Sequence, residues 1–486
     1  MKTSYRRHFI AVVLMAVTGN AMAQELTSGY FTEDYKYRHV MNPAFGNEQN
    51  YVGIPILGNF NLRMQGSLGI GDMFFKNPDF GKPGAKKTAT FMHPGIGVEE
   101  ALSKFDKDRN NLIGDLDLTI ASVGFHAFDG YNTVELKERV RFGVSLPYEF
   151  FEFAKGMNNK DYELDDLGIR ALSYAELAFG HSRQITEDLR VGGKLKFLFG
   201  VARADLSMDH MHANLVGDKW VLQGKATAEL NAKGAKWKTK ESEYNARVDA
   251  KGNPLKYQNI NDIDLDGAGL GGFGVGIDLG AVYDFKNIDI ELLQPLKVSA
   301  AITDLGFISW SNSIIAENAG DKFEFNGFNG ADIREGDGKT TFGDRLDEYK
   351  DDLADFTHLT EKGDAGSKTT ALAATMRLGA EYTMPFYDKL TVGLVGTHRF
   401  DGRNYSWTEG RLSANCAPLK WVDGGVNLAV TTYCTTMGWI VNFHPSAVNV
   451  FIGMDHMIGK TGASSIPLDS NISFCFGMNV AWGKKK

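Results

Sequence analysis

The chain has 486 residues, of which 43% are hydrophobic and 23% charged, and its formal net charge is −8. So mild a negative charge argues against a nucleic-acid binder, which would carry a basic face. Glycine (55) and phenylalanine (32) are frequent and proline (12) is scarce. This composition is typical of a membrane β-barrel with closely packed strands and aromatic girdles. No apolar run reaches the roughly 20 residues of a membrane helix.

Residues 1–23 read as a secretory signal peptide. A positively charged start precedes the apolar stretch Phe9–Val17, which is too short to span a bilayer. Ala21 and Ala23 then supply the small residues that a signal peptidase requires. We therefore expect cleavage after Ala23, with Gln24 as the first residue of the mature chain. A retained N-terminal anchor is the alternative.

Apolar and polar side chains alternate along many segments, which places successive side chains on opposite faces of a strand. From Leu189 to Val201 the odd positions are apolar or glycine, whereas the even ones are basic or small, apart from Leu198. Segments 140–150 and 472–482 repeat the pattern. Runs of about ten residues exceed the usual soluble strand and suit a tilted membrane crossing. Further candidate strands are 58–70, 114–128, 171–185, 219–231, 272–285, 295–305, 370–384, 389–400, 425–443 and 447–457.

These segments predict an all-β fold, a transmembrane antiparallel β-barrel of about 14 strands within a range of roughly 12 to 16. The barrel should occupy residues 58–486, after a plug-like segment at 24–57. Alternation directs Arg141, Arg190, Lys194 and Lys196 toward a polar lumen. It directs Phe197 and Phe199 toward lipid, so arginine at 197 should destabilise the barrel far more than glutamine at 196.

Polar stretches interrupt the strands at 151–168, 234–266, 310–368, 401–415 and 459–470. The longest, 310–368, is acidic and contains a helix-like piece from Phe342 to Leu359. A loop of that length is usually functional, although a mobile surface loop is the alternative.

Several motifs resemble catalytic or ligand sites without the required context. The Gly269–Gly274 pattern precedes an alternating segment, not the helix that a dinucleotide site needs. The calcium-like runs that begin at Asp106 and Asp262 lack essential loop positions. We therefore expect no catalytic residues, no cofactor and no metal. Three cysteines form no disulfide framework, and a Cys416–Cys434 bridge is left open.

One short motif precedes the first alternating segment, namely Asn42, Pro43 and Ala44 within "MNPAF". Together with "YVGIPILGNFNL" and "LRVGGKLKFLFGVA", it resembles an uncharacterised family of Bacteroidetes outer-membrane barrels. That family is similar to FadL-like transporters and to barrels associated with type IX secretion. The resemblance implies an outer-membrane location, and it implies that Asn42, Pro43 and Ala44 lie in or near an N-terminal hatch.

Two functions follow from this reading. The first is a passive transporter or channel for small molecules, hydrophobic ones included, which predicts an N-terminal segment in the lumen and an opening lined by apolar residues. The alternative is a non-transporting barrel that anchors secreted or surface proteins. It predicts a lumen filled by side chains and large exposed loops. Outer-membrane lipid, a small hydrophobic ligand, and a surface or secreted protein are the expected partners.

Overall fold

The computed structural model describes residues 25–83, 85, 87–108, 110–155, 161–164, 166–214, 220–248, 251, 253–265, 269–318, 323–325, 359–364, 366–456 and 471–483. The signal peptide and nearly all of the helix-like piece at 342–359 lie outside these residues. Among the described helices, none combines the length and the apolar character needed to cross a membrane.

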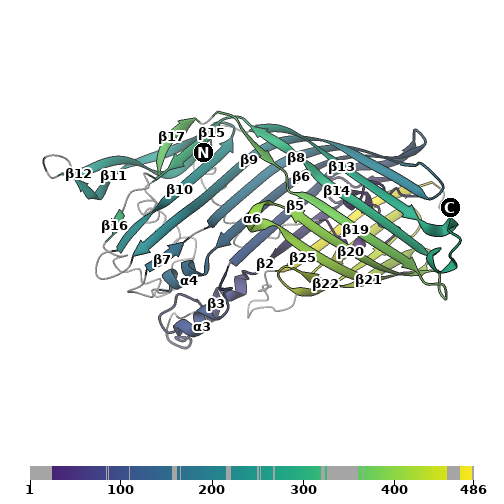
Figure 1. Cartoon of the computed structure of the whole chain (residues 1–486), viewed down its shortest axis with the longest axis horizontal. Coiled ribbons are helices and arrows are strands. Elements are labelled where there is room, and N and C mark those ends of the chain that lie inside the picture. The colour runs from purple at the N-terminus through teal and green to yellow at the C-terminus, as the bar shows by residue number, and fades with distance from the viewer. Residues whose placement is uncertain are drawn as a thin grey trace.

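Fourteen antiparallel strands form a closed barrel (Figure 1). The ring closes because β25 pairs with β1 and β2, and both of these also pair with β5. This confirms the predicted all-β barrel. In ring order, with β1 and β2 as one interrupted strand, the wall consists of β1 (Asn50–Gly53), β2 (Phe60–Gly66), β5 (Asn110–Ala127), β6 (Gly130–Leu146), β8 (Leu167–Gln184), β9 (Leu189–Asn214), β13 (Gly272–Asp284), β14 (Leu296–Trp310), β19 (Ala374–Thr383), β20 (Leu390–Phe400), β21 (Trp407–Leu419), β22 (Val422–Thr431), β23 (Thr435–Phe443), β24 (Val448–Met454) and β25 (Ile472–Trp482).

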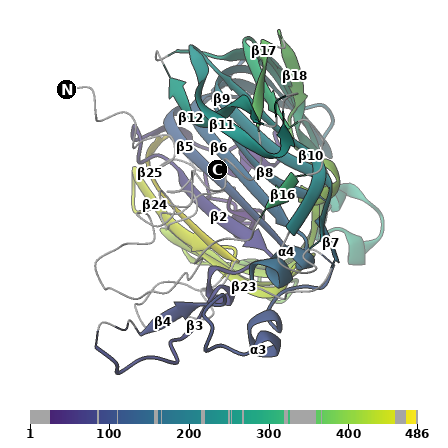
Figure 2. The ribbon, with the colours of Figure 1, turned by 90° about the vertical axis from the view of Figure 1, so that its left-hand side faces the viewer.

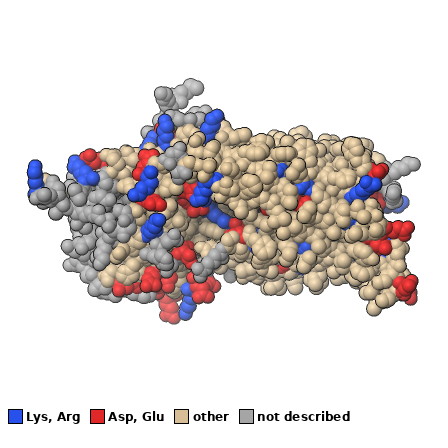
Figure 3. Space-filling model, turned by 45° about the horizontal axis from the view of Figure 1, so that its top comes forward, with Lys and Arg blue, Asp and Glu red and all other residues tan. Residues whose placement is uncertain are grey.

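The outer surface of the barrel is apolar. On β9, Leu195 is 46% exposed, whereas Lys194 and Lys196 on either side of it are 5% and 4% exposed. Leu394 and Leu412 on β20 and β21 are exposed in the same way. Figure 3 shows a wide belt with few charged side chains. A continuous exposed apolar belt of this kind is the surface that a barrel presents to lipid.

The two ends of the barrel differ. At one end short turns join the strands, for example Phe128–Asp129 between β5 and β6, and Lys420–Trp421 between β21 and β22. The longest connection at this end holds η3 (Phe285–Asn287) and η4 (Glu291–Leu293). We call this the turn end. The opposite end, the loop end, carries the long connections.

The loop end has its own secondary structure, in the four longest connections and in the shorter one between β20 and β21. It consists of η2 (Ile70–Asp72), β3 (Phe74–Lys76), β4 (Thr88–Thr90), α3 (Val98–Leu102), α4 (Tyr148–Ala154), β7 (Asp161–Leu164), β10 (Trp220–Ala232), β11 (Ala235–Val248), β12 (Pro254–Leu265), β15 (Ser313–Glu317), β16 (Phe323–Phe325), β17 (Thr360–Asp364), β18 (Lys368–Ala371) and α6 (Gly402–Tyr405). The β11–β12 hairpin projects beyond the barrel (Figure 1).

The insertion at 67–109, between β2 and β5, packs beside the barrel mouth (Figure 2). Its apolar residues share one cluster with Met64 and Phe142 of the wall. These two residues adjoin Arg63 and Arg141 in sequence, whose side chains point into the barrel, so alternation directs Met64 and Phe142 outward. The insertion therefore covers the outer face of the strands at the loop end.

Several polar stretches that we expected to be loops contain strands. Residues 407–419 form β21, residues 235–248 and 254–265 form the two strands of the β11–β12 hairpin, and residues 161–164 form β7. Within 310–368, β15 pairs with β10 and β17 and extends the wall. In β21 the side chains that face the interior are charged or polar, such as Glu409 and Arg411, so this strand has the composition of a loop.

Three smaller points concern the candidate strand 425–443, the cysteines and the range 24–57. The candidate strand 425–443 is two strands, β22 and β23, with a turn at Thr432–Cys434. Cys416 lies opposite Gly424, at the other end of β22 from that turn. None of the three cysteines, all of which the structure describes, takes part in a disulfide, so no Cys416–Cys434 bridge forms. Residues 50–53, within the range 24–57, pair in the wall as β1.

Candidate functional site in the barrel interior

An N-terminal segment, residues 25–47, lies against interior side chains of strands from all around the ring. It contains η1 (Thr27–Gly29) and α2 (Arg38–Met41), and most of it is buried. Tyr37 Oη lies 2.9 Å from Ser122 Oγ of β5. Asn42 Nδ2 donates to the carbonyl of Ala300 on β14 at 3.3 Å. Contacts with strands so far apart in the ring show that the segment passes through the interior.

The Asn-Pro-Ala motif forms a tight local turn. Asn42 Oδ1 accepts a hydrogen bond from Ala44 N at 3.0 Å, the geometry of an Asx turn beside a proline that has no N–H. The wall makes room for this turn with Gly192 of β9. A Cβ on Gly192 would lie 2.2 Å from the carbonyl oxygen of Pro43, so only glycine permits this approach.

His39 joins the segment to the wall. Its Nε2 lies 2.8 Å from Tyr51 Oη, and its Nδ1 lies 3.0 Å from Lys194 Nζ. Lys194 also donates to Glu135 Oε2 at 2.8 Å. A buried lysine with both an acceptor nitrogen and a carboxylate is well satisfied. The structure thus pairs Lys194, a predicted lumen residue, with the N-terminal segment.

A layer of buried charges crosses the middle of the interior, and Asp304 of β14 is its centre. The Asp304 carboxylate accepts hydrogen bonds from Arg139 Nη1 at 2.8 Å, Lys196 Nζ at 2.7 Å and Arg141 Nη2 at 3.2 Å. Its backbone N–H donates to Asp278 Oδ1 at 2.7 Å. Lys196 and Arg141, both predicted to face the lumen, therefore meet at one carboxylate.

The backbone at Asp304 is unusual for a strand. Its φ is +60°, in the left-handed region, and the pairing of β13 with β14 shifts register there. Such a bulge re-aims a side chain and occurs often beside functional sites. Here it accompanies an Asp304 carboxylate aimed at three cationic side chains.

Other ion pairs link strands that are not neighbours. Arg399 Nη1 of β20 lies 2.9 Å from both carboxylate oxygens of Asp115 on β5. β5 and β20 face each other, because equal numbers of wall strands separate them on either side. This ion pair therefore spans the lumen.

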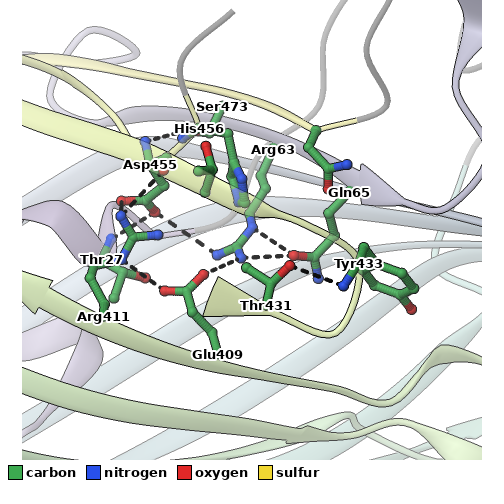
Figure 4. Close-up of polar contacts among 12 residues, drawn as sticks. Thr27, Arg63, Gln65, Glu409, Arg411, Thr431, Tyr433, Asp455, His456 and Ser473 are labelled. Carbon is green, nitrogen blue, oxygen red and sulfur yellow. Dashed lines mark hydrogen bonds and ion pairs between the residues drawn. The ribbon is translucent and has the colours of Figure 1, made fainter. Parts of the chain in front are cut away.

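A second network holds the start of the N-terminal segment (Figure 4). Asp455, after β24, accepts hydrogen bonds from Thr27 N at 2.9 Å and Ser28 N at 2.6 Å. Glu409 of β21 bridges Arg411 Nε at 2.8 Å and Arg63 Nη2 at 2.9 Å. Removing one partner of such a buried network leaves an uncompensated charge, so these groups depend on one another.

Two cavities lie near opposite ends of β9, one at Arg190 and one at Asp205–Ser207. The inner cavity, at the turn end, has a volume of about 250 Å³ and is lined by Phe31, Phe45, Arg38 and Arg190 among others. Arg190, the fourth predicted lumen residue, donates to Ser182 Oγ at 3.0 Å. The outer cavity has a volume of about 280 Å³ and lies between β8, β9 and the loop at 401–405.

That loop is held across the interior. The Tyr405 ring packs against the guanidinium of Arg170 on β8, with 3.6 Å between the guanidinium carbon and the ring centre. Asp401 forms an ion pair with the same arginine. Asn111 of β5 donates to the carbonyl of Asn404 at 2.6 Å. The loop between β20 and β21 thus covers part of the interior on the loop-end side.

Sequence reasoning did not single out most of these interior residues. Arg139, Asp304, Arg399, Glu409 and Arg411 were not among the predicted positions. Glu409 and Arg411 alternate with Gly410 and Leu412, so the period-two signal was present. This signal could have marked both residues as interior, but their other partners, Arg63 and Asp455, lie at distant positions in the sequence.

The fold and its interior define a closed antiparallel β-barrel whose lumen holds an N-terminal segment and a layer of ion pairs. The chain belongs to a family of unknown function, DUF5723, whose model matches residues 43–455. Among curated protein sequences, none matches it.

Solved structures of similar shape include two toluene transporters and a FadL homologue. The toluene transporter TbuX of Ralstonia pickettii is 8% identical, with 95% of each chain covered and a TM-score of 0.37. The toluene transporter TodX of P. putida is 9% identical, with 95% of each chain covered and a TM-score of 0.36. A Pseudomonas aeruginosa FadL homologue is 10% identical, with 95% of this chain and 98% of its own covered and a TM-score of 0.37. These likenesses concern shape alone.

Proposed function

We propose that this protein is a plugged barrel of the outer membrane that admits small molecules passively. The observation that carries the proposal is the N-terminal segment in the lumen, with one cavity near each end of β9. The apolar outer belt supports a membrane location, and the predicted signal peptide supports export. In this reading residues 25–47 act as the plug, and Asn42, Pro43 and Ala44 are the part that meets β9, β13 and β14.

A permeant would enter the outer cavity, cross the layer of charges and leave through the inner cavity. Both cavities mix charged with apolar side chains, such as Arg38 with Phe31 and Arg170 with Tyr405. Such linings suit a small amphipathic molecule, with apolar surface for contact and polar groups for orientation. A permeant must break ion pairs such as Arg399–Asp115 or pass around them, so the resting barrel should conduct poorly.

The test is removal of the plug. The chain lacking residues 24–45, exported with its own signal peptide, should form a heat-resistant barrel with a larger conductance in planar bilayers, since the turn end is then open. A chain lacking residues 235–265 serves as control, because the β11–β12 hairpin projects away from the lumen and its loss should not change conductance. Unchanged conductance of a folded, plug-deleted barrel would contradict transport through the lumen.

A second candidate function is a non-transporting barrel that anchors a secreted or surface protein. The projecting β11–β12 hairpin favours it, since a charged hairpin outside the barrel offers a surface for contact. A photoreactive residue in place of Lys240 should then form one discrete adduct in intact cells. The predicted kinship with type IX secretion barrels stays a prediction.

A further inference from the structure

We infer that the turn end carries a binding site for a divalent transition-metal ion, formed by Asp34, Asp423 and His444. Asp34 belongs to the N-terminal segment, Asp423 lies on β22, and His444 follows β23. His444 Nε2 lies 3.4 Å from Asp34 Oδ2 and 3.5 Å from Asp423 Oδ1. One ligand atom from each residue lies within 4.8 Å of the other two.

These separations match those of ligands around a metal ion. Nitrogen and oxygen atoms bind Zn²⁺ at about 2.0–2.2 Å in a tetrahedron, which places neighbouring ligand atoms about 3.3–3.6 Å apart. Both measured N···O distances fall in that interval. They exceed the roughly 2.7–2.9 Å of a charge-assisted hydrogen bond. The separations of His444 from both carboxylates therefore fit ligands that share one ion, and the two carboxylates are close enough to share it as well.

The neighbouring Asn442 of β23 supports the site. Its Nδ2 donates to Asp423 Oδ1 at 2.7 Å, and its side chain is fully buried. Its Oδ1 has no hydrogen-bond partner among the described residues. The hydrogen bond from Asn442 fixes the position of the Asp423 carboxylate beside His444. Asn442 thus orients Asp423, as a residue behind a metal ligand does.

Access and charge also favour a cation. A cavity of about 120 Å³ borders both Asp34 and Asp423, which opens a path from solvent at the turn end. The two carboxylates outweigh the single ammonium of Lys36, whose Nζ lies 3.5 Å from Asp34 Oδ1. One imidazole with two carboxylates is a ligand set that suits Zn²⁺ better than Ca²⁺ or Mg²⁺.

The site would act as a clasp. One ligand comes from the N-terminal segment and two come from the wall, so a bound ion ties the segment to β22 and β23. Such a clasp needs only the contact between these elements and does not depend on the passage of small molecules through the barrel.

The experiment uses the folded full-length mature protein in detergent, purified without a histidine tag. We expect it to bind one equivalent of Co²⁺ with the intense visible absorption of a tetrahedral site, and Zn²⁺ to displace the Co²⁺. H444Q should weaken binding by more than about 100-fold, because a direct ligand matters at least as much as a supporting residue. The matched control is H93Q, since His93 Nε2 lies 3.6 Å from the single carboxylate of Asp79 in the insertion.

A second variant separates a metal site from a plain ion-pair cluster. K36M removes the competing ammonium and should tighten Co²⁺ binding, whereas an ion-pair cluster without a metal role would bind none before or after. Should H444Q fail to give a heat-resistant barrel, D34N decides the matter, because Asp34 is not part of the wall. Absence of binding to the wild-type protein, or wild-type affinity in folded H444Q or D34N, would overturn the inference.

Discussion

Asp304 illustrates how a single residue organises the barrel interior. Its left-handed backbone costs most residues about 1–3 kcal/mol, although aspartate and asparagine tolerate it better than others. Its carboxylate compensates Arg139, Arg141 and Lys196, which are buried around it. The local cost is therefore offset by three interactions that a regular strand would not allow.

Replacing Asp304 by asparagine should keep the backbone conformation and remove the charge. We expect the free energy of unfolding, measured by urea titration of the inserted barrel, to fall by about 3–5 kcal/mol, because three cations lose a buried partner. D129N is the matched control. Asp129 also has a left-handed φ, +54°, but its ion pair with Arg183 is exposed, and loss of such a pair costs at most about 1 kcal/mol. Equal losses in the two variants would contradict this role of Asp304.

At the scale of elements, the N-terminal segment and β9 fit each other closely. Gly192 faces the segment, and a side chain there would collide with backbone atoms of Pro43 and Ala44. The adjacent Gly193 faces outward, where a Cβ would find its nearest atom at 3.5 Å. Of these two neighbouring glycines, only Gly192 must lack a side chain, because successive residues of a strand point to opposite faces.

Gly192→Ala should displace the N-terminal segment and leave the wall intact. We expect higher conductance in planar bilayers and faster tryptic cleavage at Arg38, because a 2.2 Å approach to a backbone oxygen cannot be relieved by a rotamer change. Gly193→Ala should behave like the wild type in both measurements, because its Cβ makes ordinary contacts. Closed, protease-resistant barrels from Gly192→Ala would show that the segment adjusts, and would speak against tight docking.

At the scale of the whole molecule, the difference between the two ends predicts an orientation. Bacterial outer-membrane barrels have short periplasmic turns and longer extracellular loops. The loop end, with the insertion at 67–109 and the β11–β12 hairpin, should therefore face outside. The turn end, with the proposed metal clasp and the inner cavity, should face the periplasm.

Cysteine labelling in cells tests this orientation. In a chain whose native cysteines are serines, a cysteine at Lys251 should react with an impermeant maleimide on intact cells. A cysteine at Asp129 should react only after the outer membrane is permeabilised, because the β5–β6 turn lies on the other side. Both residues are exposed, so a difference in labelling reports sidedness. The reverse pattern would invert the proposed topology.

The sequence by itself determined the wall of the barrel. Period-two alternation is a local property, and it was strong enough to predict long strands such as 189–201 and 472–482, a closed all-β barrel, and its approximate size. Where interior residues are charged, as in 407–419, alternation resembled a polar loop, because the signal depends on apolar contrast between the faces. The strand β21 was missed for that reason.

Only the tertiary structure decided which groups meet inside the barrel. Arg399 and Asp115 are 284 residues apart in the chain, and ring closure alone brings them face to face. Lys196 shows the consequence. Alternation alone predicted that exchange to glutamine would cost little stability, whereas the ion pairs of Lys196 with Asp278 and Asp304 make a large loss of stability the expected result. Asp34, Asp423 and His444 share no motif, because their proximity depends on how the N-terminal segment enters the closed barrel. Local periodicity specifies a strand and its faces, whereas the partners of an interior side chain depend on the closure of the whole ring.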